Sequence, residues 1–302
     1  MRAVGAALVG ILLVPGAALA CACGCAVFDV GTSTLLPSGP GTTLFSEYDF
    51  LDQTRNWSGT HSAPAANNDD KHIRSNFFVA GGQAMFNDDW GVMVEIPYTD
   101  RTFTTADSGT PETFQHSALG DIRLMGVYSG FSKDMSSGLI FGVKLPTGDH
   151  TYANFDSDVE ISSGSTDLLL GGFTGGAFDV AQSWTWFAQA IWQKPLATQG
   201  GYHPGFELNG AVGASYRSWK LAPNVELSPV VQVLMSERGR DGGPLGDADS
   251  TGYQRVLVSP GLALSVDKWK LYADVELPVW QHVNGNQLIA PYALKFIASY
   301  SL

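Results

Sequence analysis

The stretch YALKFIASYSL, residues 292–302, decides the fold of this chain. Its apolar side chains fall on every second residue, from Tyr292 and Leu294 through Phe296 to Tyr300 and Leu302. Successive side chains of a β-strand point to opposite sides, so this alternation predicts a strand with one apolar face. Because that face continues to the last residue, it must lie against a large apolar environment.

The same period of two recurs along most of the chain, whereas helical spacing is scarce. Trp184, Trp186 and Trp192 share one face of a second segment. Aromatic residues of the apolar faces gather toward the segment ends. The alternation predicts twelve strands, at 42–52, 71–86, 89–103, 119–131, 137–146, 166–180, 183–195, 204–218, 222–237, 252–265, 267–281 and 286–302.

The predicted connections alternate in length, which favours a barrel over a soluble sandwich. Long ones lie near 53–70, 104–118, 147–165, 196–203 and 238–251, and short ones near 87–88, 132–136, 181–182, 219–221 and 266, with a short outer one at 282–285. An even strand count with short periplasmic turns and long outer loops is typical of outer-membrane barrels. The prediction is an all-β, transmembrane, antiparallel up-and-down β-barrel of about twelve strands. A two-layer sandwich would also alternate apolar and polar residues, but it gives no reason for alternating loop lengths.

Composition agrees with a membrane setting and excludes several classes. Charged residues are only 15% of the 302, and the formal net charge is −12. An acidic chain is a poor binder of phosphate backbones, so no nucleic-acid partner is expected. No internal run approaches the roughly 18 apolar residues of a membrane-spanning helix.

The N-terminus has the pattern of an export signal. Arg2 precedes an apolar run from Val4 to Val14, and Ala18-Leu19-Ala20 fits a cleavage site. We therefore expect a signal peptide at 1–20, a cysteine-containing periplasmic segment or plug at 21–41, and a barrel at 42–302. Cleavage after Ala20 would leave Cys21 first, and lipidation of that cysteine is the alternative to ordinary processing.

Several motifs resemble those of the Gram-negative outer-membrane family associated with the meta pathway of phenol degradation, whose members are described as transporters. They are ALGDIR at 118–123, VKLPTG at 143–148 and GSTDLLLG at 164–171. The resemblance covers most of the chain after about residue 70. It implies a barrel that passes small molecules, including aromatic ones, and it assigns no functional residues.

Three cysteines at alternate positions, Cys21, Cys23 and Cys25, form the most unusual local feature. Their thiolates suit copper(I) or zinc, although lipidation or disulfide formation would also account for them. No other cofactor is expected. All six histidines fall in or beside the predicted outer loops, and exclusion of polar residues from the lipid band explains this placement without a metal site.

The predicted inner face carries charges of both signs, and such side chains set which solutes enter a pore. They are Glu95, Arg101, Arg123, Lys144, Glu207, Arg217, Glu226, Arg255, Lys270, Asp274, Glu276 and Lys295. In a barrel of this size the same charges could instead pair across the interior and close it.

These observations predict a porin-like channel for passive passage of a small molecule of hydrophobic or aromatic character. The alternatives are a metal-handling or redox-partner barrel that uses the cysteines, and a closed structural or adhesive barrel. The expected partners are outer-membrane lipid, lipopolysaccharide, the solute, and the barrel-assembly machinery through the C-terminal strand. No enzyme is expected, because the chain lacks a Gly-Xaa-Ser-Xaa-Gly nucleophile motif.

Overall fold

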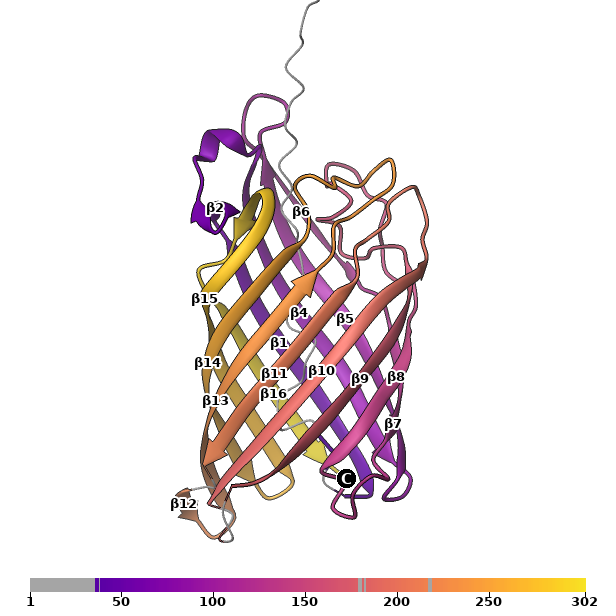
Figure 1. The fold of residues 1–302 in the computed structure, drawn as a ribbon, viewed down its shortest axis with the longest axis vertical. Coiled ribbons are helices and arrows are strands. Elements are labelled where there is room, and N and C mark those ends of the chain that lie inside the picture. Colours follow the sequence, from indigo (N-terminus) through magenta and orange to yellow (C-terminus); the bar gives the residue numbers. More distant parts are fainter. Residues whose placement is uncertain (1–35, 38, 179–180, 182, 217–218) are drawn as a thin grey trace, which may run out of the picture.

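The computed structural model describes residues 36–302 except 38, 179–180, 182 and 217–218. Within this part of the chain, twelve antiparallel strands close into a barrel (Figure 1). Their order around the wall is β1, β4, β5, β7, β8, β9, β10, β11, β13, β14, β15 and β16. β1 pairs with both β4 and β16, which closes the ring. No helix among the described residues is long and apolar enough to cross a membrane.

The strands agree with the predicted segments to within a few residues at most ends. The wall strands are β1 (Gly41–Gln53), β4 (Asp70–Met85), β5 (Trp90–Thr105), β7 (Arg123–Tyr128), β8 (Ser137–Lys144), β9 (Thr166–Ala177), β10 (Trp184–Ala197), β11 (Glu207–Tyr216), β13 (Val225–Arg238), β14 (Tyr253–Val266), β15 (Trp269–Ile289) and β16 (Ala293–Ser301). Unpredicted short elements extend the connections: β2 (Arg55–Gly59), β3 (His61–Ser62), the 3-10 helix η2 (Ala65–Asn67), β6 (Glu112–Leu119) and β12 (Trp219–Ala222).

Two predicted segments differ from the structure in a physically clear way. Residues 286–289 belong to β15 and pair with β2, whereas residues 293–301 form β16 and pair with β1. The predicted connection at 282–285 is therefore part of β15, and the predicted strand 286–302 is interrupted at 290–292. Pro291 lies in that interruption, and a proline has no N–H to offer a ladder. In β15 the register shifts between its partners Val256 and Leu257. This bulge leaves Trp280 exposed, whereas strict alternation predicts it on the polar face.

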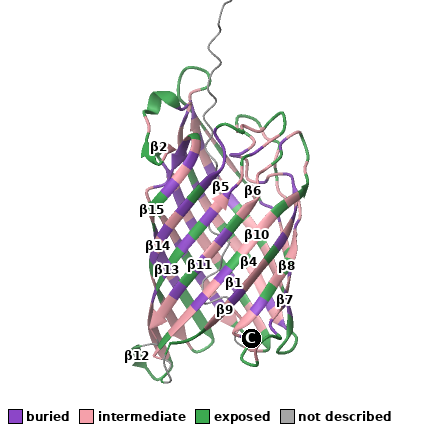
Figure 2. Ribbon diagram, in the orientation of Figure 1, coloured by how far each residue is buried: buried purple, intermediate pink, exposed green. Residues whose placement is uncertain are grey.

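Buried and exposed residues alternate along the strands, as Figure 2 shows. Many exposed positions of the wall are apolar, including Val212, Leu271 and Phe296. At the end with the short turns, tryptophan and tyrosine pair across neighbouring strands with ring centroids 4.7–5.1 Å apart, as Trp90–Tyr128, Trp184–Tyr216 and Trp269–Tyr300. Aromatic girdles mark the two membrane interfaces of such barrels. These pairs therefore have the arrangement of such a girdle at the short-turn end.

Glycines opposite phenylalanines explain part of the high glycine content. Phe45 faces Gly81 and Phe187 faces Gly213 in the strand register, with both rings inside the barrel. A Cβ added to either glycine would overlap the ring of its partner. The absence of a side chain lets the ring lie over the neighbouring strand, which fills a narrow interior without overpacking it.

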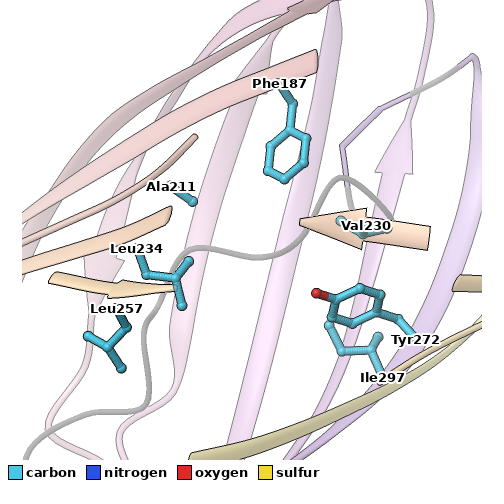
Figure 3. Close-up of a cluster of buried hydrophobic side chains, with 7 residues drawn as sticks. All are labelled: Phe187, Ala211, Val230, Leu234, Leu257, Tyr272 and Ile297. Carbon is cyan, nitrogen blue, oxygen red and sulfur yellow. The ribbon is translucent and has the colours of Figure 1, made fainter. Parts of the chain in front are cut away.

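Apolar side chains also pack inside the barrel, in two clusters. One cluster joins Phe187, Ala211, Val230, Leu234, Leu257, Tyr272 and Ile297, whose side chains point into the barrel (Figure 3). A second joins Met85, Val127, Met135 and Phe173. Leu36 packs against both clusters. At least this part of the expected N-terminal segment lies in the lumen, and residues 21–35 are outside the described residues.

Candidate functional site: the lumen

A cavity of about 190 Å³ lies inside the barrel, and we call it the polar cavity. Strands from most of the wall and three connections line it. Its ionisable lining has an excess of acids. The carboxylates are Glu47, Asp49, Glu95, Asp121, Asp158, Glu160, Asp167 and Glu207, and the cations are Arg101, Arg123, Lys144 and Arg238.

On one side of the polar cavity, Lys295 of β16 lies between two carboxylates of β1. Its Nζ is 2.8 Å from Glu47 Oε1 and 3.4 Å from Asp49 Oδ1. Asp49 is directly opposite Lys295 in the strand register, and Glu47 lies two residues along the same inner face. The Lys295 side chain is 2% exposed, so the ammonium depends on these two acids for its charge compensation.

A second group of the same composition lies across the lumen. Lys144 of β8 places its Nζ 2.9 Å from Asp121 Oδ2 and 3.2 Å from Asp167 Oδ2. Asp167 is its register partner on β9, while Asp121 comes from the connection between β6 and β7. The hydroxyls of Ser163 and Ser165 accept further hydrogen bonds from Lys144, which ties the β8–β9 connection to the wall.

A third group joins β11, β13 and the connection that follows β13. Arg238 Nη1 is 3.4 Å from Glu207 Oε1, and Arg238 Nη2 is 2.9 Å from Asp241 Oδ1. The Tyr202 hydroxyl donates to Asp241 Oδ2 at 2.8 Å and accepts from Arg238 at 2.9 Å. In each of the three groups one cation lies between two carboxylates, and we call them the acidic triads.

Arg123 and Glu95 line two neighbouring cavities of the lumen. They are register partners on β7 and β5, with Arg123 Nη1 3.6 Å from Glu95 Oε2. Both line the polar cavity and also a smaller cavity of about 50 Å³, which we call the apolar cavity. The apolar cavity is lined mainly by uncharged side chains, including Leu36, Met93, Met125, Ile140, Phe173 and Ile191. The two residues are about 20% exposed, so they remain accessible to a solute.

The β8–β9 connection, residues 145–165, folds inward across the outer opening, and we call it the mouth loop. Arg101 of β5 donates from Nη1 to the carbonyl oxygens of Val159 and Glu160 and from Nε to Ser75 Oγ. Val159 is fully buried against Ile73, Phe103 and Leu288. These contacts hold the loop against the inner wall.

Two acids of the mouth loop have raised pKa values. Burial is the main cause in both, and it raises the pKa of Glu160 to about 7 and that of Asp156 to about 6. The negative charge of Asp107 adds to the effect on Asp156. A hydrogen bond from the backbone N–H of Tyr152 opposes the rise at Glu160, while Asp149, Asp156 and Asp158 add to it. The loop therefore changes charge between about pH 6 and 7.

The charged residues that the sequence predicts on the inner face lie in several different parts of the barrel. Glu95, Arg101, Arg123, Lys144 and Glu207 line the polar cavity. Lys295, Asp274, Glu276 and Arg255 are buried in the wall beside the lumen, where Asp274 accepts hydrogen bonds from Tyr272, Ser259 and Gln232. Glu226 and Lys270 lie near the periplasmic ends of β13 and β15. Arg217 lies outside the described residues.

Of the triad residues, the sequence predicted only Lys144, Glu207 and Lys295, and it missed the other five carboxylates and Arg238. Glu47 and Asp49 alternate within the predicted strand 42–52, so the period of two could have placed them on the inner face. Asp167 falls at the start of a predicted strand and Arg238 one residue beyond the end of another. Asp121 falls inside the predicted strand 119–131, although the structure places it between β6 and β7. Asp241 lies in a predicted connection, where alternation carries no information.

The described residues contain no group of three or more His, Cys, Asp and Glu side chains arranged to hold a metal ion. Two histidines contact single acids instead, His72 of β4 with Asp52 and His116 of β6 with Asp149. Cys21, Cys23 and Cys25 lie outside the described residues, so the copper or zinc site stays a prediction.

Comparison with known proteins defines the class of fold. No protein-family model matches the chain, and no curated protein matches it. Among solved structures, the barrel is similar to the COG4313 outer membrane channel from Pseudomonas putida F1, with a TM-score of 0.67 and 11% identity over 91% of this chain and 100% of that one. It is also similar to the β domain of the Bordetella autotransporter BrkA, with a TM-score of 0.51 and 11% identity over 87% and 100%. The chain thus has the fold of a bacterial outer-membrane β-barrel.

Proposed function

We propose that this protein is a passive channel of the bacterial outer membrane for small molecules. The observation that carries the proposal is the polar cavity, a space of about 190 Å³ inside a closed barrel with ionisable groups on its walls. Rings of charged side chains around such a space select solutes by charge and size. The similar solved structure from Pseudomonas putida is also named an outer membrane channel.

For the solute, we propose a small molecule with an apolar or aromatic body. Met93, Met125 and Phe173 of the apolar cavity supply the soft, adaptable surface that suits such a group. The motifs at 118–123, 143–148 and 164–171 support the same class, because they resemble a family associated with phenol degradation. We expect lipid and lipopolysaccharide around the barrel and assembly through its C-terminal strand, and we expect no catalytic activity.

Single-channel recording of the purified protein in planar bilayers tests the proposal. We expect discrete conductance steps that small aromatic alcohols, such as phenol and benzyl alcohol, block in a concentration-dependent way. Correct folding is checked beforehand by the heat-dependent shift in gel mobility that folded barrels give. A folded barrel that conducts nothing in any applied salt would overturn the channel and leave a closed structural barrel.

A further inference from the structure

The three acidic triads lie on different sides of the polar cavity. One joins β1 and β16, one joins β8, β9 and the β6–β7 connection, and one joins β11, β13 and the residues after β13. Each contributes carboxylates to the lining of the same cavity. A solute that crosses the barrel through this cavity therefore meets all three.

Each triad contains one more negative group than positive groups. The lining of the polar cavity contains eight carboxylates and four cations. Two further triad residues, Lys295 and Asp241, do not line it, and because their charges are opposite they leave the excess of four carboxylates unchanged. This formal excess of four negative charges is enclosed by low-dielectric walls. Such walls focus the potential of the charges into the water of the pore.

The triads also show why the excess is tolerated in a folded barrel. A buried ammonium or guanidinium between two carboxylates offsets much of their mutual repulsion. The oxygens receive hydrogen bonds besides, as when Ser162 donates to Asp121 and the Gly205 N–H donates to Asp241. The wall can thus hold negative charges at fixed positions, because each buried carboxylate of a triad lies beside a cation.

We propose that the acidic triads form a cation filter and that the solute of this channel carries a positive charge, as a small amine with an apolar body does. This inference rests on the proposed channel function and deepens it. The ammonium of the solute would pass the carboxylates of the polar cavity. Its apolar body would fit the apolar cavity, which shares Glu95 and Arg123 with the polar cavity.

The test is the reversal potential of the full-length protein in a planar bilayer under a KCl gradient at pH 8, where the Glu160 carboxylate is ionised. We expect potassium to permeate several times more readily than chloride. One carboxylate of each triad is then neutralised in the combined variant Glu47→Gln, Asp121→Asn and Glu207→Gln. Each change leaves a cation paired with one remaining acid, so none creates an unpaired buried charge.

Each neutralisation should lower the potassium-to-chloride permeability ratio roughly twofold. This is the size expected when one unit charge, screened by about 0.1 M salt, acts with opposite sign on the two ions across roughly 8 Å of water. The combined variant should approach equal permeability. Glu237→Gln is the matched control, because Glu237 is the neighbour of Arg238 on the opposite face of β13 and does not line the cavity. Its ratio should equal that of the unchanged protein.

Benzylammonium and benzoate, which have similar size and opposite charge, test the solute class. We expect benzylammonium to carry or block current at concentrations where benzoate does neither, and we expect the combined variant to lose this difference. Conductance without cation preference, or a preference that survives the three neutralisations, would overturn the filter while leaving the channel function intact. Absence of any conductance would instead overturn the channel itself.

Discussion

Single residues of this barrel are sorted by face, and the consequences of a substitution depend on that face. Val212 of β11 is half exposed on the outer wall, in a row of apolar side chains from neighbouring strands. Ser215 lies three residues further on the inner face, where its hydroxyl pairs with that of Thr185. The inner face accepts polar groups because other polar groups surround them.

Val212→Arg should therefore impair membrane assembly, at a cost of roughly 2–4 kcal/mol for an arginine near the midplane of the bilayer. Ser215→Arg is the comparison, and it should assemble to a much greater extent. The measurement is the fraction of each variant that folds into lipid vesicles, read from heat-dependent gel mobility. Equal losses for the two variants would contradict the assignment of the faces.

Lys295 illustrates the dependence of buried charges on their partners. Lys295→Met would leave Glu47 and Asp49 side by side without their cation, and breaking a buried pair in this way typically costs about 3–5 kcal/mol. Glu47→Gln keeps the Asp49–Lys295 pair and should cost much less. Urea-induced unfolding in vesicles gives the two free energies. If the two variants unfold at the same urea concentration, Lys295 does not compensate both acids.

The mouth loop is the element on which access to the lumen depends. Its residues are held by Arg101 and by the apolar contacts of Val159 rather than by strand pairing. Tyr152 stacks on His116 with ring centroids 3.7 Å apart, which adds a further contact at the opening. Such a segment can leave the wall without breaking the barrel ladder.

Acidification should favour the inward position of the mouth loop. The pKa of Glu160 is about 7 in the docked loop, above its ordinary value of 4.5, so the docked loop binds more protons than the released loop between those values. Docking is then most stable below about pH 4.5 and weakens as the pH rises toward 7. The raised pKa of Asp156, about 6, acts in the same direction.

We therefore expect single-channel conductance to fall as the pH is lowered from 8 to 5. Glu160→Gln, which carries no titratable group at this position, should show a much weaker pH dependence and a conductance closer to the low-pH value. If that variant keeps the full pH dependence, titration of another group is responsible.

At the scale of the whole molecule, the lumen has a polar part and an apolar part. Ionisable groups line the polar cavity, whereas the two apolar clusters pack against Leu36. Figure 3 shows the larger of these clusters. An apolar constriction of this kind limits water and ion flow more strongly than a polar one of equal width. The part of the lumen that the apolar clusters narrow should therefore determine the conductance.

Leu36→Ala should raise the conductance, because it removes an apolar side chain from between the two clusters. Leu36 is only partly buried, so the stability loss should be below the ~2–5 kcal/mol of a fully buried leucine. Leu196→Ala is a suitable control, since Leu196 is exposed near the outer end of β10. Unchanged conductance in Leu36→Ala would show that the constriction lies elsewhere.

The sequence by itself determined the strands, the faces and the class of barrel. Alternation is a local property with a period of two, so it placed Lys295 inside and Phe296 outside without knowledge of any partner. It also separated long outer connections from short turns. Its errors came where local geometry breaks the period, at the β15 bulge before Trp280 and at Pro291.

Only the tertiary structure decided which charges meet. Asp49 and Lys295 are neighbours because β1 and β16 close the barrel, and Asp121 reaches Lys144 because a connection folds against the inner wall. The inward path of the mouth loop likewise depends on Arg101, which lies far away in the sequence. Alternation specifies the side of a strand but not the stagger between strands or the course of a loop. Those are settled by ring closure and by the need to pair buried charges.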